Sequence, residues 1–233
     1  MTTFHTKIDI DTESYLLNQS QYSIHEIDDI FNSANFFPEP YMQISKLQAT
    51  AIQFFITTAK IKNIVEVGTF VGYSAFSMAY VLPPDSTLRT IEINEEFHTK
   101  AEYNQYQYMK NFKNRKKTHV GGIENIEFIH DDAKNVFPRL AAKADTIDLV
   151  FLDGDKEHYL FYLEWAIKCL KKGAYFLIDN ALFKGRVVND NGQHITTKYS
   201  RSIRDMTTKL KKSDRFDYFF LPVGDCMIVA QKK

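Results

Sequence analysis

Cysteine is scarce in this chain of 233 residues, and long apolar runs are missing altogether. Cys169 and Cys226 lie in apolar stretches and are interpreted as buried thiols, which excludes a disulfide framework. No segment approaches the ~18 apolar residues that a membrane-spanning helix needs. Residues 1–7 lack the apolar core of a secretory signal, so we expect no signal peptide. These absences predict a soluble cytoplasmic protein with no membrane partner.

Net charge is also missing, because 29 Lys and Arg residues balance 29 Asp and Glu residues. Binding to nucleic acid or to an anionic membrane usually needs an excess of positive charge, so no nucleic-acid partner is expected. The basic run at residues 110–117 is the exception. We favour a solvated helix end and loop there over a contact with phosphates or an acidic substrate. A hydrophobic content of 44% suits a globular domain with a core.

Apolar runs alternate with helical patterns from residue 63 onward, which predicts an α/β fold with a parallel sheet and helices on both faces. The tail carries two strand-like runs separated by Pro-Val-Gly, which is typical of a hairpin. The predicted strands are 64–67, 88–93, 125–130, 147–152, 174–179, 215–221 and 225–230, and the predicted helices are 45–60, 73–82, 95–110, 133–143, 156–171 and 197–211.

The first 40 residues differ from the rest of the chain, since they are polar with scattered apolar positions. They end in Phe36-Phe37-Pro38-Glu39-Pro40, where the prolines break any helix. We therefore predict short helices outside the sheet, forming a helical cap or an oligomer arm over residues 1–40, and a main domain over residues 41–233. For the aromatic residues Phe36, Phe37 and Tyr41 we favour packing or an oligomer contact over a role in a pocket.

Two aspartates close neighbouring apolar runs. Asp153 follows Leu149-Val150-Phe151-Leu152, and Asp179 follows Tyr175-Phe176-Leu177-Ile178. If these strands are neighbours, their ends lie about 5 Å apart. Two carboxylates at that distance repel unless one takes up a proton or a cation lies between them. Asn180 adds a neutral oxygen, and Lys156 stands three residues after the first acid. The pattern predicts a site for a hard metal ion with a base beside it.

The turn after the first strand is a candidate ligand site, because open α/β sheets bind ligands at the carboxyl ends of their strands. Gly68 allows a ligand to approach the backbone closely, and Ser74 offers a hydroxyl or a helix N–H group. A plain tight turn is an equally good interpretation of the glycines. Phe70 occupies the second glycine position of the nicotinamide fingerprint G-x-G-x-x-G, which disfavours a nicotinamide cofactor.

Acidic residues near this turn add to the ligand hypothesis. Glu92, near the end of the second strand, is placed to accept hydrogen bonds from both ribose hydroxyls, although an exposed charge is the alternative. Glu66 lies inside an apolar strand and needs a partner. The ammonium group of an amino-acid-bearing cofactor would serve, as would a lysine or a backbone N–H group. Asp132 and Ala133 either reach an adenine edge or begin the next helix.

The segment at residues 65–74 resembles the S-adenosylmethionine turn of the cation-dependent O-methyltransferases, which include catechol and caffeoyl-CoA O-methyltransferases. Three further stretches match that family in order, at residues 151–159, 178–188 and 221–225. Upstream, residues 42–45 resemble the family's segment at the mouth of the cofactor site. The resemblance covers residues 40–233. His158 and Cys226 depart from the residues that are frequent in the family at those positions.

The resemblance implies a Rossmann-like sheet of seven strands, mostly parallel with an antiparallel last strand, and a homodimer. It also implies S-adenosylmethionine and a divalent cation (Mg²⁺, with Mn²⁺ or Ca²⁺ as alternatives) as cofactors. Lys156 would be the catalytic base, and we expect it to open the helix 156–171, where the helix dipole disfavours its charge. The implied metal ligands are Asp153, Asp179 and Asn180, and the implied cofactor-binding residues are Glu66, Gly68, Ser74, Glu92, Asp132, Ala133 and Asp153.

The resulting hypothesis is an O-methyltransferase that acts on a catechol-like hydroxyl of a small molecule. The polar, turn-rich loop at residues 189–192 is a candidate mobile lid. An RNA methyltransferase on the same fold is the alternative, supported only by the basic run. A cofactor-binding protein without chemistry is disfavoured by the intact metal and base residues.

Overall fold

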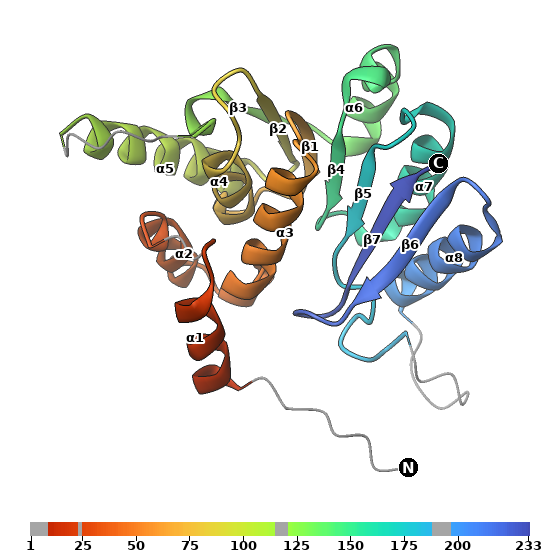
Figure 1. The fold of residues 1–233 in the computed structure, drawn as a ribbon, viewed down its shortest axis with the longest axis horizontal. Helices are drawn as coiled ribbons and strands as arrows, with labels where there is room; N and C mark the ends of the chain where they lie inside the picture. Colours follow the sequence, from red (N-terminus) through yellow and green to blue (C-terminus); the bar gives the residue numbers. More distant parts are fainter. Residues whose placement is uncertain (1–8, 23–24, 115–120, 188–196) are drawn as a thin grey trace.

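A seven-stranded sheet organises the residues that the computed structural model describes, which are 9–22, 25–114, 121–187 and 197–233 (Figure 1). The first five strands are parallel to one another, and the last is antiparallel to both of its neighbours, as predicted. The strand order is β3-β2-β1-β4-β5-β7-β6. The strands are β1 (Asn63–Val67), β2 (Thr87–Glu92), β3 (Ile126–His130), β4 (Leu149–Leu152), β5 (Tyr175–Ile178), β6 (Phe216–Leu221) and β7 (Met227–Lys232).

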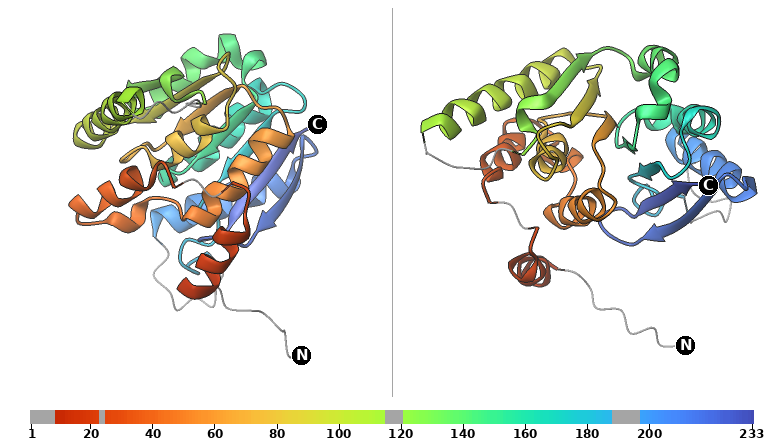
Figure 2. Two further views of the ribbon diagram at one scale, coloured as in Figure 1. Left: turned by 60° about the vertical axis from the view of Figure 1, so that its left-hand side comes forward. Right: turned by 45° about the horizontal axis from the view of Figure 1, so that its top comes forward.

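Helices cover both faces of this sheet (Figure 2). One face packs against α3 (Lys46–Thr58), α4 (Tyr73–Tyr80) and α5 (Glu95–Asn114), and the other packs against α6 (Ala133–Leu140), α7 (Tyr159–Cys169) and α8 (Lys198–Lys212). The described residues also form short 3-10 turns, which are η1 (Ala34–Phe36), η2 (Pro40–Met42), η3 (Ile123–Asn125), η4 (Ala141–Thr146) and η5 (Lys156–His158).

The central strand β4 explains why the sheet could be located from the sequence. All four of its side chains are fully buried. Val150 and Leu152 join the core under α6 to α8, whereas Leu149 and Phe151 join the core under α3 and α4. A parallel strand covered on both faces appears in sequence as an unbroken apolar run. The predicted strand and helix boundaries agree with the structure to within a few residues.

The N-terminal segment forms short helices, as expected. Helix α2 (Asp28–Ser33) contributes Ile30 to the core beneath α3 and α4. Helix α1 (Ile10–Gln19) buries no residue, and in Figure 1 it extends away from the sheet. The predicted division at residue 40 stays a prediction.

The predicted helix 156–171 does not begin as an α-helix. Asp155 has a left-handed backbone with a φ of 46°, and its side chain does not cap the following turn. Residues Lys156–His158 therefore form the 3-10 turn η5, and α7 starts only at Tyr159. The expectation that Lys156 opens an α-helix is wrong, and the argument from the α-helix dipole loses its basis.

Two predictions fall partly or wholly on residues outside the described part of the chain. The basic run 110–117 continues past the end of α5 into undescribed residues, and the candidate lid at 189–192 lies wholly among them. None of the described helices combines the length and the apolar character that a membrane crossing requires.

Candidate active site

A cavity of about 820 Å³ opens at the carboxyl ends of β1, β2, β4 and β5. It contains most of the residues that the sequence singled out, whereas Glu66 and Asp179 are buried beside it. The predicted residues that line it are Gly68, Ser74, Glu92, Asp132, Ala133, Asp153, Lys156 and Asn180.

The two predicted acids lie side by side, because the register of β4 and β5 pairs Leu152 with Ile178, the residues just before them. The side chain of Asp153 is 10% exposed and Asp179 is 3% exposed. Burial raises the pKa of Asp153 to about 6, although Lys156 lowers it. Burial, reinforced by the charge of Asp153, raises the pKa of Asp179 well above its usual value. The pair is therefore poised to hold a proton or a cation.

Asn180 and Lys156 complete this group. Asn180 follows Asp179 directly and has a left-handed backbone with a φ of 58°, a conformation that asparagine tolerates better than most residues. The ammonium group of Lys156 lies 3.6 Å from Asp153 Oδ1 and donates a hydrogen bond of 3.1 Å to the backbone carbonyl of Asp153. Two carboxylates and an amide form an all-oxygen donor set that suits Mg²⁺. Within the described residues no group of three or more His, Cys, Asp and Glu side chains could hold a metal ion.

Glu66 is fully buried in β1 and only partly satisfied. Its Oε2 accepts a hydrogen bond of 2.6 Å from the hydroxyl of Thr90, and the hydroxyl of Thr69 lies 2.5 Å from that of Thr90. The other oxygen, Oε1, is buried and has no hydrogen-bond partner among the described residues. Burial raises the pKa of Glu66 to about 7, against the opposing effect of the Ser74 and Thr90 hydroxyls. An unpaired buried carboxylate oxygen is costly and suits a cationic ligand group.

Glu92 shapes the turn after β1. Its Oε2 accepts hydrogen bonds from the backbone N–H groups of Thr69 (3.1 Å) and Phe70 (2.9 Å). Its Oε1 accepts a third from Asn94 N–H at 3.0 Å. Glu92 is thus a structural support that also borders the cavity, and its predicted contact with a ribose stays a prediction.

Gly68 has a packing role that sequence analysis missed. Its φ is +96°, and a Cβ atom there would lie 2.8 Å from the backbone nitrogen of Gly154. A Cβ atom on Gly154 would in turn lie 2.9 Å from the Cα atom of Gly68. The ends of β1 and β4 therefore meet backbone to backbone. The close approach of a ligand, which we expected of Gly68, stays a prediction.

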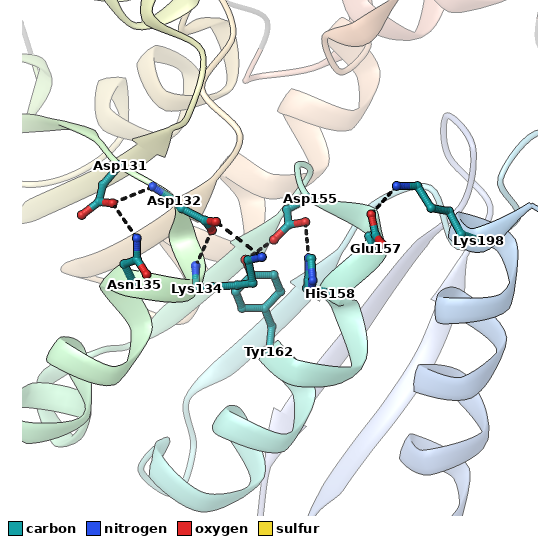
Figure 3. Close-up of polar contacts among 9 residues, drawn as sticks. All are labelled: Asp131, Asp132, Lys134, Asn135, Asp155, Glu157, His158, Tyr162 and Lys198. Carbon is teal, nitrogen blue, oxygen red and sulfur yellow. Dashed lines mark hydrogen bonds and ion pairs between the residues drawn. The ribbon is translucent and has the colours of Figure 1, made fainter.

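Asp132 caps helix α6, which was one of the two roles considered for it. Its Oδ1 accepts a hydrogen bond of 2.8 Å from Lys134 N–H. The neighbouring Asp131 accepts a hydrogen bond of 3.1 Å through its Oδ1 from Asn135 Nδ2 (Figure 3). A contact of Asp132 or Ala133 with adenine stays a prediction.

Asp155 borders the cavity and was not predicted as a site residue. Figure 3 shows its carboxylate between His158 and Tyr162. It accepts a hydrogen bond of 2.5 Å from the Tyr162 hydroxyl, and its other oxygen lies 2.7 Å from His158 Nδ1. The only signal in the sequence was its place in the stretch Asp153-Gly154-Asp155-Lys156.

Aromatic rings also line the cavity. Phe183 and Tyr199 make an edge contact with ring centroids 5.9 Å apart, and the ammonium group of Lys184 lies 4.7 Å from the ring centroid of Tyr41. Phe37 packs against Phe70 as expected. Tyr41 borders the cavity, and the oligomer contact considered for it stays a prediction.

Comparisons with known proteins find O-methyltransferases by sequence and by fold. The sequence profile of the O-methyltransferase family matches residues 18–233. The chain is 29% identical to caffeoyl-CoA O-methyltransferase 1 of Zea mays over 95% of this chain and 84% of the relative. It is 26% identical to catechol O-methyltransferase of Niastella koreensis over 72% of this chain and 71% of that protein.

Its fold is similar to that of an O-methyltransferase from Bacillus cereus whose structure was solved in complex with SAH. The TM-score is 0.81 at 20% identity, covering 96% of this chain and 97% of the other. The match of the family profile to nearly the whole sequence shows that the chain belongs to the O-methyltransferase family of enzymes, which methylate hydroxyl groups.

Proposed function

We propose that this enzyme transfers a methyl group from S-adenosylmethionine to a catechol-like hydroxyl of a small molecule, with the help of a divalent cation. The observation that carries the proposal is the buried pair Asp153 and Asp179, which lies with Asn180 and Lys156 beside a cavity large enough for two organic ligands. The names of the relatives support a catechol or caffeoyl acceptor.

The oxygen atoms of Asp153, Asp179 and Asn180 would hold the cation, with Mg²⁺ expected first and Mn²⁺ or Ca²⁺ as alternatives. A bound cation supplies Lewis-acid chemistry that makes an adjacent hydroxyl more acidic. The raised pKa values of both aspartates support this assignment, since Lys156 alone does not offset the cost of burying two charged carboxylates side by side.

Lys156 would take the proton from the acceptor hydroxyl after it has lost one of its own, since only the neutral amine can accept a proton. Its side chain is 23% exposed, and its ammonium group is anchored on the backbone carbonyl of Asp153 at 3.1 Å. The base therefore lies beside the acid pair. Tyr41, Phe183 and Tyr199 would hold the aromatic ring of the acceptor and keep water away, which aligns the hydroxyl with the methyl donor.

The donor would bind along the carboxyl ends of β1 and β2. Glu66 would meet its ammonium group, Glu92 its ribose, and the segment Asp132–Ala133 its adenine. A homodimer is also proposed, supported by the exposed apolar residues of α1. The balanced charge supports a small-molecule acceptor over nucleic acid. The cytoplasmic location expected from the sequence stays a prediction.

Removal of the cation is expected to stop turnover without releasing the donor. With S-adenosylmethionine, Mg²⁺ and a catechol such as caffeate, an excess of chelator should lower kcat by at least about a hundredfold, because the acid pair alone cannot acidify the hydroxyl. Added Mg²⁺ should restore the rate. Calorimetric titration with SAH in chelator should give an unchanged Kd. Full turnover in excess chelator would remove the cation from the mechanism.

Donor binding is expected to weaken as the pH falls through 7. The pKa of Glu66 is raised to about 7 in the ligand-free protein, so at pH 6 this side chain is mostly protonated and must lose its proton to meet an ammonium group. The Kd for SAH should therefore be about tenfold higher at pH 6 than at pH 8. Glu66→Gln is the matched control, since a neutral amide cannot titrate. A pH dependence that persists in this variant would assign the effect to another group.

A further inference from the structure

Gln48, near the start of α3, is a buried polar residue that the proposed mechanism does not use. It is 3% exposed. Its side-chain oxygen accepts a hydrogen bond of 3.0 Å from Ser45 N–H, and its own backbone N–H donates to Ser45 Oγ at 3.1 Å. This reciprocal pair is a capping box that fixes the first turn of α3. Because the carbonyl end of the amide is held by Ser45, the NH₂ end must point the other way.

The NH₂ end of Gln48 points at the acid pair. Its Nε2 donates a hydrogen bond of 2.8 Å to Asp179 Oδ1, across 131 positions of the sequence. One oxygen of Asp179 is thus occupied by a donor that cannot turn away without breaking the cap. A carboxylate held in this way has a fixed side-chain orientation, and the amide donor favours its charged form.

The hairpin between β6 and β7 closes the space around Gln48. Gly224 has a φ of +60°, and a Cβ atom there would lie 2.2 Å from Gln48 Oε1 and 2.7 Å from its Nε2. The absence of a side chain at this glycine leaves the volume that the amide fills. Gln48 is therefore held from three directions, by Ser45, Asp179 and the hairpin.

We propose that Gln48 is a positioning residue that sets Asp179 for cation binding. The proposal rests on the proposed function, because it assumes that Asp179 is a metal ligand. Outer partners of metal ligands orient them, and their loss typically costs 10–100-fold in metal affinity. The same amide also lies close in the chain to Tyr41, Met42 and Gln43, which border the cavity just before the cap at Ser45.

The test is the affinity of the full chain for Mn²⁺, measured by calorimetric titration without donor or acceptor. Gln48→Met keeps the length of the side chain but removes the donor, and should raise the Kd for Mn²⁺ by about 10–100-fold. The Kd for SAH, measured without metal, should stay within about twofold of the wild-type value. A general loss of structure would weaken both ligands together, so this split separates positioning from folding.

Two controls isolate the contact with Asp179. Ser45→Ala removes a hydroxyl of the capping box but leaves the Ser45 N–H group that holds the amide. Gln53→Met removes another buried amide of α3, whose Nε2 donates to Ser77 O at 2.8 Å, away from the acids. Both should bind Mn²⁺ within about threefold of the wild type, because neither removes the donor to Asp179.

The outcomes separate this inference from the function beneath it. If the wild type binds Mn²⁺ and Gln48→Met binds it equally well, Gln48 does not position Asp179, while the proposed function stands. If the wild type binds neither Mn²⁺ nor Mg²⁺, the proposed role of a cation is wrong, and so is the role of Gln48 in positioning a ligand for it. If circular dichroism shows that Gln48→Met does not fold, Gln48→Asn gives the same test, because its shorter amide cannot bridge Ser45 and Asp179.

Discussion

Replacing Asp153 with asparagine is expected to lower kcat/KM by about a thousandfold or more while it stabilises the ligand-free protein. The activity falls because the site loses one of its two anionic ligands, and with it the charge that holds a cation against an ionising hydroxyl. A steady-state assay with S-adenosylmethionine, Mg²⁺ and a catechol measures this loss. Retention of more than about a tenth of the wild-type turnover would contradict the assigned role.

The gain in stability follows from the raised pKa of Asp153. A carboxylate whose pKa is about 6 in the folded protein, instead of 3.8, destabilises the fold at pH values above 6. Removing its charge should therefore raise the free energy of unfolding by about 1–3 kcal/mol at pH 8 in chelator. The difference between variant and wild type should shrink as the pH falls from 6 toward 4, because the wild-type acid takes up its proton. Chemical denaturation at several pH values measures it. Asp214→Asn, at an exposed position, should change neither property.

Replacing Lys156 with methionine is expected to lower kcat by about 10²–10⁴-fold, the usual contribution of a general base. Binding of SAH should survive, because the lysine was assigned to proton transfer and not to the donor. The affinity for Mn²⁺ should not weaken, since the change removes a positive charge 3.6 Å from Asp153, a proposed metal ligand. Single-turnover kinetics at saturating ligands measures the chemical step directly.

Lys156→Arg separates proton acceptance from charge. Arginine keeps the positive charge but does not lose a proton near neutral pH, so this variant should be nearly as slow as Lys156→Met. An arginine variant that retains most of the activity would show that the residue acts by its charge alone. Lys172→Met, at an exposed position in the turn before β5, serves as the control and should turn over at the wild-type rate.

The acid pair was predictable from sequence because its geometry depends on the most regular part of the fold. Strands β4 and β5 are buried on both faces, so each appears as an apolar run whose end is marked by the first charged residue. Neighbouring parallel strands bring such ends together, so Asp153 was expected to lie beside Asp179 if the two strands were neighbours, and the structure shows that they are. The same reasoning located Glu66 within β1 and Glu92 at the end of β2.

The supports of these residues were not predictable, because they come from caps, turns and 3-10 segments. Gln48 reaches Asp179 across 131 positions, and no periodic pattern connects a helix cap to a strand end that far away. Lys156 was assigned to the start of an α-helix, whereas the left-handed Asp155 is followed by a 3-10 turn and α7 begins only later. Tyr41 lies in a short 3-10 turn after two prolines, where a sequence gives no direction for a side chain.

The position of β7 within the sheet affects how the enzyme is made. This strand lies between β5 and β6, although it follows both in the chain. Its hairpin carries Gly224, which accommodates Gln48, and Asp225, whose carboxylate accepts two hydrogen bonds from Lys184 N–H at 2.9 and 2.8 Å. During synthesis from the N-terminus, Asp153 and Asp179 leave the ribosome well before the strand that completes their surroundings. A ribosome that stops before β7 would release a chain with every proposed catalytic residue and no finished site.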